Sequence, residues 1–253
     1  MTKISAVIIT FNEERNIERC INSLQNIVDE IIVVDSFSTD KTVEICKRFD
    51  IKFITTQWLG YSNTKNFGNS LAANDYILSI DADEALSDEL KNEILQIKQS
   101  EKIADAYLMK RLTNYCGSWI HHCGWYPDKK LRLWNKQKGK WEGNIHEEVK
   151  MQADARITEL KSDLLHYSYY SIQQHINQAN KFTDLTASEA FKKAKKSSFF
   201  KIIINPIIKF IKDYFIKLGF WDGYHGFVIC TISAFATFLK YIKLRELHKN
   251  SSL

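Results

Sequence analysis

The chain has 253 residues, of which 45% are hydrophobic and 13% aromatic, and its 9 glycines and 2 prolines argue against a disordered or loop-rich protein. The five cysteines are odd in number and form no CxxC pair, so we expect reduced thiols rather than a disulfide framework. The net charge of +5 is mild, and the basic clusters suit nucleic acid, an anionic membrane surface or solvated faces. Of these partners we expect the membrane surface and no nucleic acid.

The first hundred residues alternate predicted strands and helices. Buried strands are expected at 4–10, 30–35, 51–55 and 76–80. Helices are expected between them, the first with Asn12 as its N-cap, and a further helix is expected from about 87 to 99. Strands separated by single helices imply crossover connections, and hence a parallel sheet covered on both faces.

Polar residues follow three of these strands. They are Thr10, Asn12 and Glu13 after the first, Asp35, Ser36, Ser38 and Asp40 after the second, and Asp81 and Asp83 after the fourth. In an open parallel sheet, ligands bind beyond the carboxyl ends of the strands. The three clusters therefore predict one shared site at that edge.

The acidic pair at the end of the fourth strand indicates the chemistry of the site. Asp81 and Asp83 are two residues apart, so their side chains point to the same side of an extended chain. Mg²⁺ or Mn²⁺ binds such carboxylates together with substrate phosphates and would neutralise a diphosphate leaving group. The chain contains neither GxGxxG nor GxxxxGK[ST], which leaves phosphate handling to the metal and to nearby Lys or Arg.

The character of the sequence changes after residue 100. A strand at 106–111 precedes an aromatic loop, NYCGSWIHHCGWYPD, and the stretch 172–194 has a helical pattern. From 199 to 247 the chain is apolar and basic, with an amphipathic helix expected at 206–218 and 14 uncharged residues at 226–239. Because a spanning helix needs roughly 20 apolar residues, this combination favours a membrane-surface contact, with a helix packed on the domain as the alternative.

Taken together, these motifs resemble a known family. The stretches ISAVIITFNEERNIERCINSL, EIIVVDSFSTDKT and NDYILSIDADEALS occur in the order seen in family 2 nucleotide-sugar glycosyltransferases of the GT-A fold. WLGYSNTKNFG, KWEGNIHEEV, LLHYSYYS and KLGFWDGYHG extend the likeness to glycosyltransferases of lipopolysaccharide inner-core assembly, including its β-1,4-glucosyltransferases. The resemblance implies an α/β fold of GT-A type, with a mostly parallel nucleotide-binding sheet flanked by helices and a C-terminal helical appendage.

The resemblance also implies domain boundaries and an activity. We expect a glycosyltransferase domain at 1–170, with its nucleotide-sugar half at 1–100 and its acceptor half at 101–170, and a helical region at 171–253 that contacts a membrane. The expected reaction moves a hexose, with UDP-glucose as the first candidate donor, to a lipid-linked saccharide at the inner leaflet of the cytoplasmic membrane. The expected enzyme is therefore cytoplasmic, peripherally membrane-associated and inverting.

The family's site roles carry over residue by residue. The nucleotide sugar would contact Thr10, Asn12, Glu13, Asp35, Ser38, Asp40, Lys65 and Asp81. Asp83 would be the chief metal ligand beside Asp81, with His166 or His146 completing the set. An imidazole ligand suits Mn²⁺ better than Mg²⁺, and a hydrogen-bonded structural histidine is the alternative for each.

Direct displacement requires a base, because a sugar hydroxyl is a poor nucleophile until its proton is removed. Glu147, in NIHEEV, resembles the position usually assigned to the base, with its neighbour Glu148 and with Asp128, in WYPDKKLRLW, as alternatives. Here the sequence departs from the Glu-Asp pair usual in the family.

Aromatic and basic residues around the loop are candidates for acceptor binding. Trp119, Trp125, Tyr126 and Arg132 form this set, with core packing and surface solvation as the alternatives. A zinc site at Cys116, His121, His122 and Cys123 is disfavoured because adjacent ligands do not converge easily.

The sequence leaves three rival functions open. The first is a glycosidase, which leaves the nucleotide clusters unexplained. The others are a glycosyltransferase with another donor and a protein or polysaccharide acceptor, and a non-catalytic nucleotide-sugar binding module.

Overall fold

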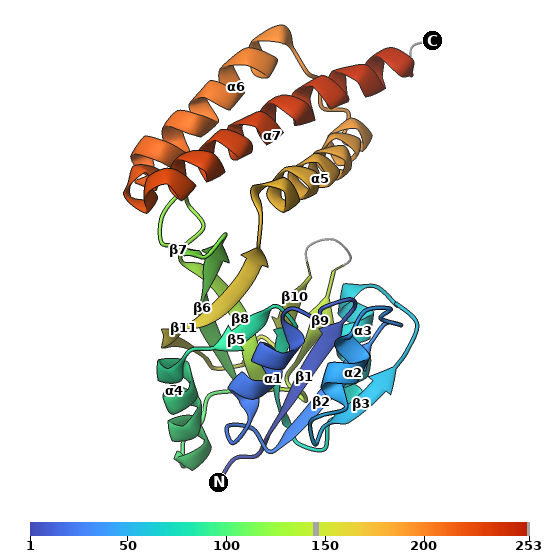
Figure 1. The fold of residues 1–253 in the computed structure, drawn as a ribbon, viewed down its shortest axis with the longest axis vertical. Coiled ribbons are helices and arrows are strands. Elements are labelled where there is room, and N and C mark those ends of the chain that lie inside the picture. Colours follow the sequence, from blue (N-terminus) through green and yellow to red (C-terminus); the bar gives the residue numbers. More distant parts are fainter. Residues whose placement is uncertain (144–146, 252–253) are drawn as a thin grey trace. The chain divides into compact units, whose positions relative to one another are not determined.

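The computed structural model describes residues 1–143 and 147–251 (Figure 1). The chain forms two compact units, one of Met1–Arg111 and Asp128–Tyr167, the other of Leu112–Pro127 and Ser168–Leu253. Two long strands, β6 (Ala106–Tyr115) and β11 (Ile157–Tyr169), run from the first unit into the second.

The first unit contains most of the strands. Its elements in chain order are β1 (Ile4–Thr10), α1 (Ile17–Leu24), β2 (Glu30–Asp35), α2 (Thr42–Cys46), β3 (Lys52–Thr55), α3 (Tyr61–Ser70), β4 (Tyr76–Asp81), β5 (Glu84–Leu86), α4 (Asp88–Gln99), β8 (Asp128–Asn135), β9 (Gly139–Glu142) and β10 (Glu148–Met151). All four strands expected in the first hundred residues are present.

The sheet is parallel in its N-terminal half and antiparallel beyond it. The strand order is β3-β2-β1-β4-β8-β6-β11-β5, and the pairs β3–β2, β2–β1 and β1–β4 are parallel. The pairs β4–β8, β8–β6 and β11–β5 are antiparallel. Strands β9 and β10 form a separate two-stranded antiparallel ribbon, which we call the β9–β10 ribbon. The parallel half brings the carboxyl ends of β1, β2 and β4 to one edge (Figure 1).

Alternation along the central strand builds a core on each side of the sheet. Every residue of β1 is buried. Ile4, Ala6 and Ile8 pack with apolar residues of α1, α2 and α4, whereas Val7 and Ile9 pack with α3 and β9. Because successive side chains of a strand point to opposite faces, a largely apolar run such as ISAVIIT indicates a strand covered on both sides.

One glycine sets how closely α3 approaches this sheet. A Cβ atom at Gly68 would lie 2.5 Å from Cγ1 of Val7 and 3.1 Å from Cγ2 of Val34. Both distances are shorter than the 3.5–4.0 Å or so at which carbon atoms make favourable contact. The absence of a side chain at Gly68 therefore lets α3 lie against β1 and β2.

The second unit is mainly helical. It contains β7 (Ser118–Ile120), paired with the end of β6, then α5 (Ile172–Lys192), α6 (Phe199–Ile211), a π-helical turn (Lys212–Ile216), a 3₁₀ turn (Gly219–Asp222) and α7 (Gly223–Asn250). Helix α7 packs against both α5 and α6 (Figure 1). A small core forms where β6 and β7 meet α7, from Tyr115, Ile120, Cys123, Ile229 and Cys230.

Two local expectations are corrected here. The helix expected at 206–218 begins instead at Phe199, because the hydroxyl of Ser198 accepts the N–H of Lys201 as an N-cap and Pro206 lies inside the helix. The first helix, α1, begins at Ile17 after Asn16, so Asn12 is not its N-cap. Asn12 instead adopts a positive φ of 55°.

The helical unit exposes many large apolar side chains. Those on α6, the turns after it and the start of α7 are Phe199, Phe200, Ile203, Ile204, Ile207, Ile208, Ile211, Phe215, Ile216, Phe220, Trp221, Tyr224 and Phe227. Among the described residues, one helical stretch, Gly219–Asn250, is long and apolar enough to cross a membrane by length and composition alone.

Candidate active site

The loops after β1 and β2 are fastened to each other by side-chain hydrogen bonds. The N–H of Asn12 donates to Oγ of Ser38 at 2.8 Å, and Oδ1 of Asn12 accepts the N–H of Thr39 at 2.8 Å. Ser38 in turn donates its hydroxyl and its N–H to the carboxylate of Asp35, at 2.5 and 3.0 Å. The structure thus brings together Asn12, Asp35 and Ser38, which the sequence assigned to one pocket.

Glu13 and Asp40 lie beside this junction. The N–H of Glu13 donates to the hydroxyl of Thr42, and Asp40 accepts the N–H of Glu14. Burial raises the pKa of the Glu13 carboxyl to about 7; a hydrogen bond from Asn16 opposes this rise, and the negative charge of Asp83 adds to it. A carboxyl with this pKa is half-protonated near neutral pH, so nearby positive charge would favour its ionised form.

Two hydroxyl groups at the ends of these strands are buried and have no hydrogen-bond partner among the residues that the structure describes. They are Oγ1 of Thr10 and Oγ of Ser36. Buried polar groups are normally paired, with protein, water or ligand. Their place beside Asn12 and Asp35 is consistent with a pocket that accepts a polar ligand.

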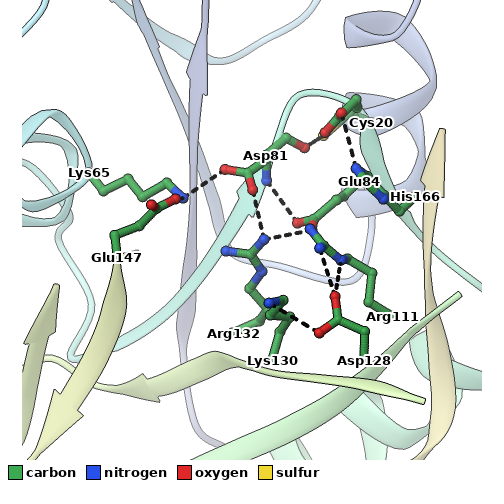
Figure 2. Close-up of polar contacts among 11 residues, drawn as sticks. Cys20, Lys65, Asp81, Glu84, Arg111, Asp128, Lys130, Arg132, Glu147 and His166 are labelled. Atoms are coloured by element: carbon green, nitrogen blue, oxygen red, sulfur yellow. Dashed lines mark hydrogen bonds and ion pairs between the residues drawn. The ribbon is translucent and has the colours of Figure 1, made fainter. Parts of the chain in front are cut away.

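Asp81 is held by two cations (Figure 2). Nζ of Lys65 lies 2.9 Å from its Oδ1, and Nη2 of Arg132 lies 2.7 Å from its Oδ2. Burial would raise the pKa of the Asp81 carboxyl, but the charges of Arg132 and Lys65 hold it well below its usual range. Asp81 is therefore ionised across the physiological range.

Glu84 contacts Asp81 and the arginines beside it. Its carboxylate is fully buried, accepts the N–H of Asp81 at 3.0 Å, and contacts the guanidinium groups of Arg132 at 2.6 Å and Arg111 at 3.3 Å. The sequence assigned no role to Glu84, since nothing local in it indicates that this residue pairs with an arginine 48 residues later.

Two residues lie in different surroundings from those that their assigned roles suggest. Arg132, expected to contact the acceptor, is 3% exposed and bridges Asp81 and Glu84. Asp128, an alternative base, is bound by Arg111 at 2.7 Å and by Lys130 at 3.1 Å. Both side chains are thus engaged in the ion-pair network of Figure 2.

Asp83 meets His166, as the sequence suggested. Oδ2 of Asp83 lies 3.2 Å from Nε2 of His166, and the backbone carbonyl of Asp83 accepts the N–H of Tyr167. The pairing of β11 with β5 places His166 opposite Glu84 and so beside the acidic run. A carboxylate and an imidazole at this separation suit a cation that takes its remaining ligands from phosphate and water.

The described residues contain no group of three or more His, Cys, Asp or Glu side chains that could hold a metal ion. Asp83 and His166 together would leave the remaining positions of a cation to phosphate oxygens and water. His146, the other expected metal ligand, lies outside the described residues.

The candidate base Glu147 lies close to Lys65. Its Oε1 is 3.4 Å from Nζ of Lys65, and its side chain is 22% exposed. Figure 2 shows the Glu147 carboxylate and the Asp81 carboxylate at the same ammonium group. Glu148 begins β10 and is exposed, opposite Glu142 in the β9–β10 ribbon.

The aromatic residues expected to bind the acceptor belong to the second unit. Trp125 packs with Tyr115, Tyr169 and His175 in its small core. Trp119 is half-buried on β7, and the ring of Tyr126 contacts that of His121.

The carboxylate of Asp222 contacts two histidines and a cysteine of this loop. Asp222 accepts the N–H groups of His121 and His122, and its Oδ1 lies 2.9 Å from Nδ1 of His122. Sγ of Cys123 faces the same carboxylate. These contacts connect the loop to the start of α7. Asp222, whose role sequence reasoning missed, lies in the quoted stretch KLGFWDGYHG.

Comparison with known proteins identifies a family whose model matches the chain. The family model described as "Glycosyl transferase family 2" matches residues 5–150. An uncharacterized glycosyltransferase of Rickettsia typhi is 42% identical, covering 99% of this chain and 89% of its own. The lipopolysaccharide core biosynthesis glycosyltransferase LpsC of Rhizobium meliloti is 29% identical, over 97% of this chain and 93% of LpsC. Among solved structures, residues 1–349 of Staphylococcus aureus TarS align with a TM-score of 0.46 and 16% identity, covering 99% and 92%.

Proposed function

Because the chain belongs to glycosyl transferase family 2, we propose that it transfers a hexose from a nucleotide-diphosphate sugar to a lipid-linked saccharide of the lipopolysaccharide core. The chain is a glycosyltransferase, and the family and the α/β fold class expected from its sequence are confirmed. The similarity to LpsC over nearly the whole chain supports the choice of acceptor class.

The donor pocket is formed by the loops after β1, β2 and β4. The observation that carries this proposal is that Asp81 and Asp83, at the end of β4, lie at the same edge of the sheet as the hydrogen-bonded Asn12 and Ser38 of the loops after β1 and β2. The nucleoside contacts Thr10, Asn12, Glu13, Asp35, Ser38 and Asp40, and Asp81 contacts the ribose or the diphosphate. UDP-glucose is the proposed donor.

Asp83 and His166 would hold a divalent cation, Mg²⁺ or Mn²⁺, together with the donor phosphates. When bound, the cation supplies charge neutralisation for the diphosphate leaving group. The distance of 3.2 Å between Oδ2 of Asp83 and Nε2 of His166 supports this pairing, since both side chains would be close enough to hold one small ion.

Glu147 accepts the proton of the attacking hydroxyl, and the product anomer is inverted. Its carboxylate is partly exposed, which leaves it accessible to an acceptor. Glu148 and Asp128 are weaker candidates, because Glu148 is exposed in the ribbon and Asp128 is engaged by Arg111 and Lys130.

The helical region 171–253 contacts the inner leaflet of the cytoplasmic membrane, and residues 1–170 form the transferase domain. The exposed apolar side chains of α6 lie near Lys201 and Lys209 of the same helix and Lys212 of the turn that follows, a pattern typical of helices that lie in a membrane interface. Trp119, Trp125 and Tyr126 provide an aromatic platform for the acceptor saccharide.

The donor proposal is tested by calorimetric titration of UDP with and without Mn²⁺. We expect metal-dependent binding by the wild type and its loss in Asp83→Ala, whereas Asp88→Ala, which alters an exposed carboxylate on α4, binds like the wild type. Transfer from UDP-glucose is then assayed on lipopolysaccharide-core acceptors. Absence of UDP binding under every metal condition would sink the UDP-based proposal.

The membrane proposal is tested by flotation with vesicles that contain anionic lipid. We expect the wild type to float, and a variant with Phe199, Phe200 and Ile216 changed to Ser to remain in the soluble fraction. Equal behaviour of the two proteins would contradict the proposed surface.

A further inference from the structure

One face of α3 forms hydrogen bonds with β9 and the residue after it. The candidate base, Glu147, lies between the two strands of the β9–β10 ribbon. The hydroxyl of Ser62 donates to the carbonyl of Gly143 at 2.5 Å. The amide of Asn66 donates to the carbonyl of Trp141 at 2.9 Å and accepts its N–H at 3.0 Å. Ser62, Lys65 and Asn66 are three and four residues apart, which places them on one side of the helix.

Lys65 lies at the centre of this face and is almost fully buried, with 1% of its side chain exposed. Its ammonium contacts the carboxylates of Asp81 and Glu147 and lies 4.3 Å from the ring centroid of Trp141. A buried charge that lost its partners would incur a large desolvation penalty. These contacts therefore fix the ammonium rather than leave it free to meet an incoming phosphate.

The two carboxylates depend on Lys65 to different degrees. Asp81 also contacts Arg132, so it keeps a cation if Lys65 is removed. Within the part of the chain that the structure describes, Lys65 is the cation that contacts Glu147. Removing the ammonium should consequently disturb Glu147 more than Asp81.

We infer that Lys65 is a positioning residue that acts on the reaction through Glu147, with Asn66 holding β9, the partner of the strand that begins directly after Glu147. The inference rests on the proposed function, in which Glu147 is the base. It replaces the role expected from the sequence, in which Lys65 binds the donor phosphates. Binding of the nucleotide and placement of the base are then separate tasks, assigned to Asp83 and to Lys65.

A double-mutant cycle tests this inference. The variants are Lys65→Met, Lys65→Arg, Glu147→Gln and the double variant Lys65→Met/Glu147→Gln, with Lys91→Met as a control because Lys91 makes a surface ion pair with Asp88. For each protein, kcat is measured by sugar transfer and the Kd of UDP by calorimetry.

We expect Lys65→Met to lower kcat by roughly 10- to 100-fold, part of the 10²- to 10⁴-fold that a general base typically contributes. The Kd of UDP should change less than about threefold, and Lys65→Arg should recover part of the lost kcat. The double variant should be no slower than Glu147→Gln alone, because residues that act as a unit are not additive. Lys91→Met should match the wild type.

Asn66→Ala provides a second route if Lys65→Met does not fold. It keeps the ammonium but removes both hydrogen bonds to Trp141. We expect it to lower kcat with unchanged UDP affinity, and to have no further effect in the Glu147→Gln background.

The opposite results are equally clear. A tenfold or greater weakening of UDP binding in Lys65→Met, with losses of kcat that multiply in the double variant, would make Lys65 a phosphate ligand and overturn the inference alone. Transfer by Glu147→Gln at the wild-type rate would overturn the inference together with the proposed base. A wild type that binds UDP but transfers no sugar would refute the proposed function, and the inference with it.

Discussion

Replacing Glu84 with Gln removes one buried charge while preserving the size of the side chain. One oxygen of Glu84 faces Arg132 and Arg111, and the other accepts the N–H of Asp81. An amide has one oxygen and one NH₂ group, so in either orientation a donor would face another donor. The substitution also leaves Arg132 to share Asp81 with Lys65.

The expected cost follows from the burial of the network. Removing one partner of a buried ion pair typically costs about 3–5 kcal/mol, because the remaining charge is left uncompensated. For a protein of this size, 1 kcal/mol shifts the melting temperature by about 2–4 °C, so Glu84→Gln should lower it by about 6–20 °C.

Thermal unfolding followed by circular dichroism measures the shift, and hydrogen exchange at the amide of Asp81 reports on the site itself. Glu101→Gln serves as the control, because Glu101 is exposed and its replacement should change stability by less than about 0.5 kcal/mol. A melting temperature of Glu84→Gln within 1 °C of the wild type, with unchanged exchange at Asp81, would refute the argument that this network supports the site.

Two further predictions concern the helical unit. Asp222→Asn should place an amide donor against the N–H groups of His121 and His122 and cost about 1–3 kcal/mol, which would be detected as faster proteolysis within residues 112–127. Burial lowers the pKa of the His175 imidazole from 6.5 to about 4, so below pH 6.5 the unfolded chain takes up a proton that the folded protein does not. The free energy of unfolding should therefore fall by up to about 1.4 kcal/mol for each pH unit by which the pH is lowered from 6.5 to 4. Measured by urea unfolding, this dependence on pH should be weaker in His175→Gln. The same dependence in both proteins would contradict a lowered pKa of His175.

The parallel half of the fold could be predicted because its information is local. Apolar runs such as ISAVIIT, followed at once by polar residues, define both the strands and the edge at which Asp35 and Asp81 lie. The network beneath Asp81 could not be predicted, since Glu84, Arg111 and Arg132 meet through strand pairings that no local pattern specifies.

Side chains with more than one structural use account for the local errors. Asn is favoured both as an N-cap and in left-handed turns, and at Asn12 the turn prevails because the side chain then bonds to Thr39 of the neighbouring loop. Pro206 suggested the first turn of a helix, but the cap supplied by Ser198 starts α6 earlier.

The close approach of α3 to the sheet at Gly68 links packing to turnover. Gly68 follows Lys65 by three residues, so any outward movement of the helix at Gly68 also withdraws the ammonium from Asp81 and Glu147. A methyl group 2.5 Å from Val7 requires a displacement of about 1 Å to reach ordinary contact, and misplacements of that size can cost about 10²-fold in rate. This buried glycine, without touching any substrate, thereby limits which residues evolution or an engineer can place there while keeping the enzyme fast.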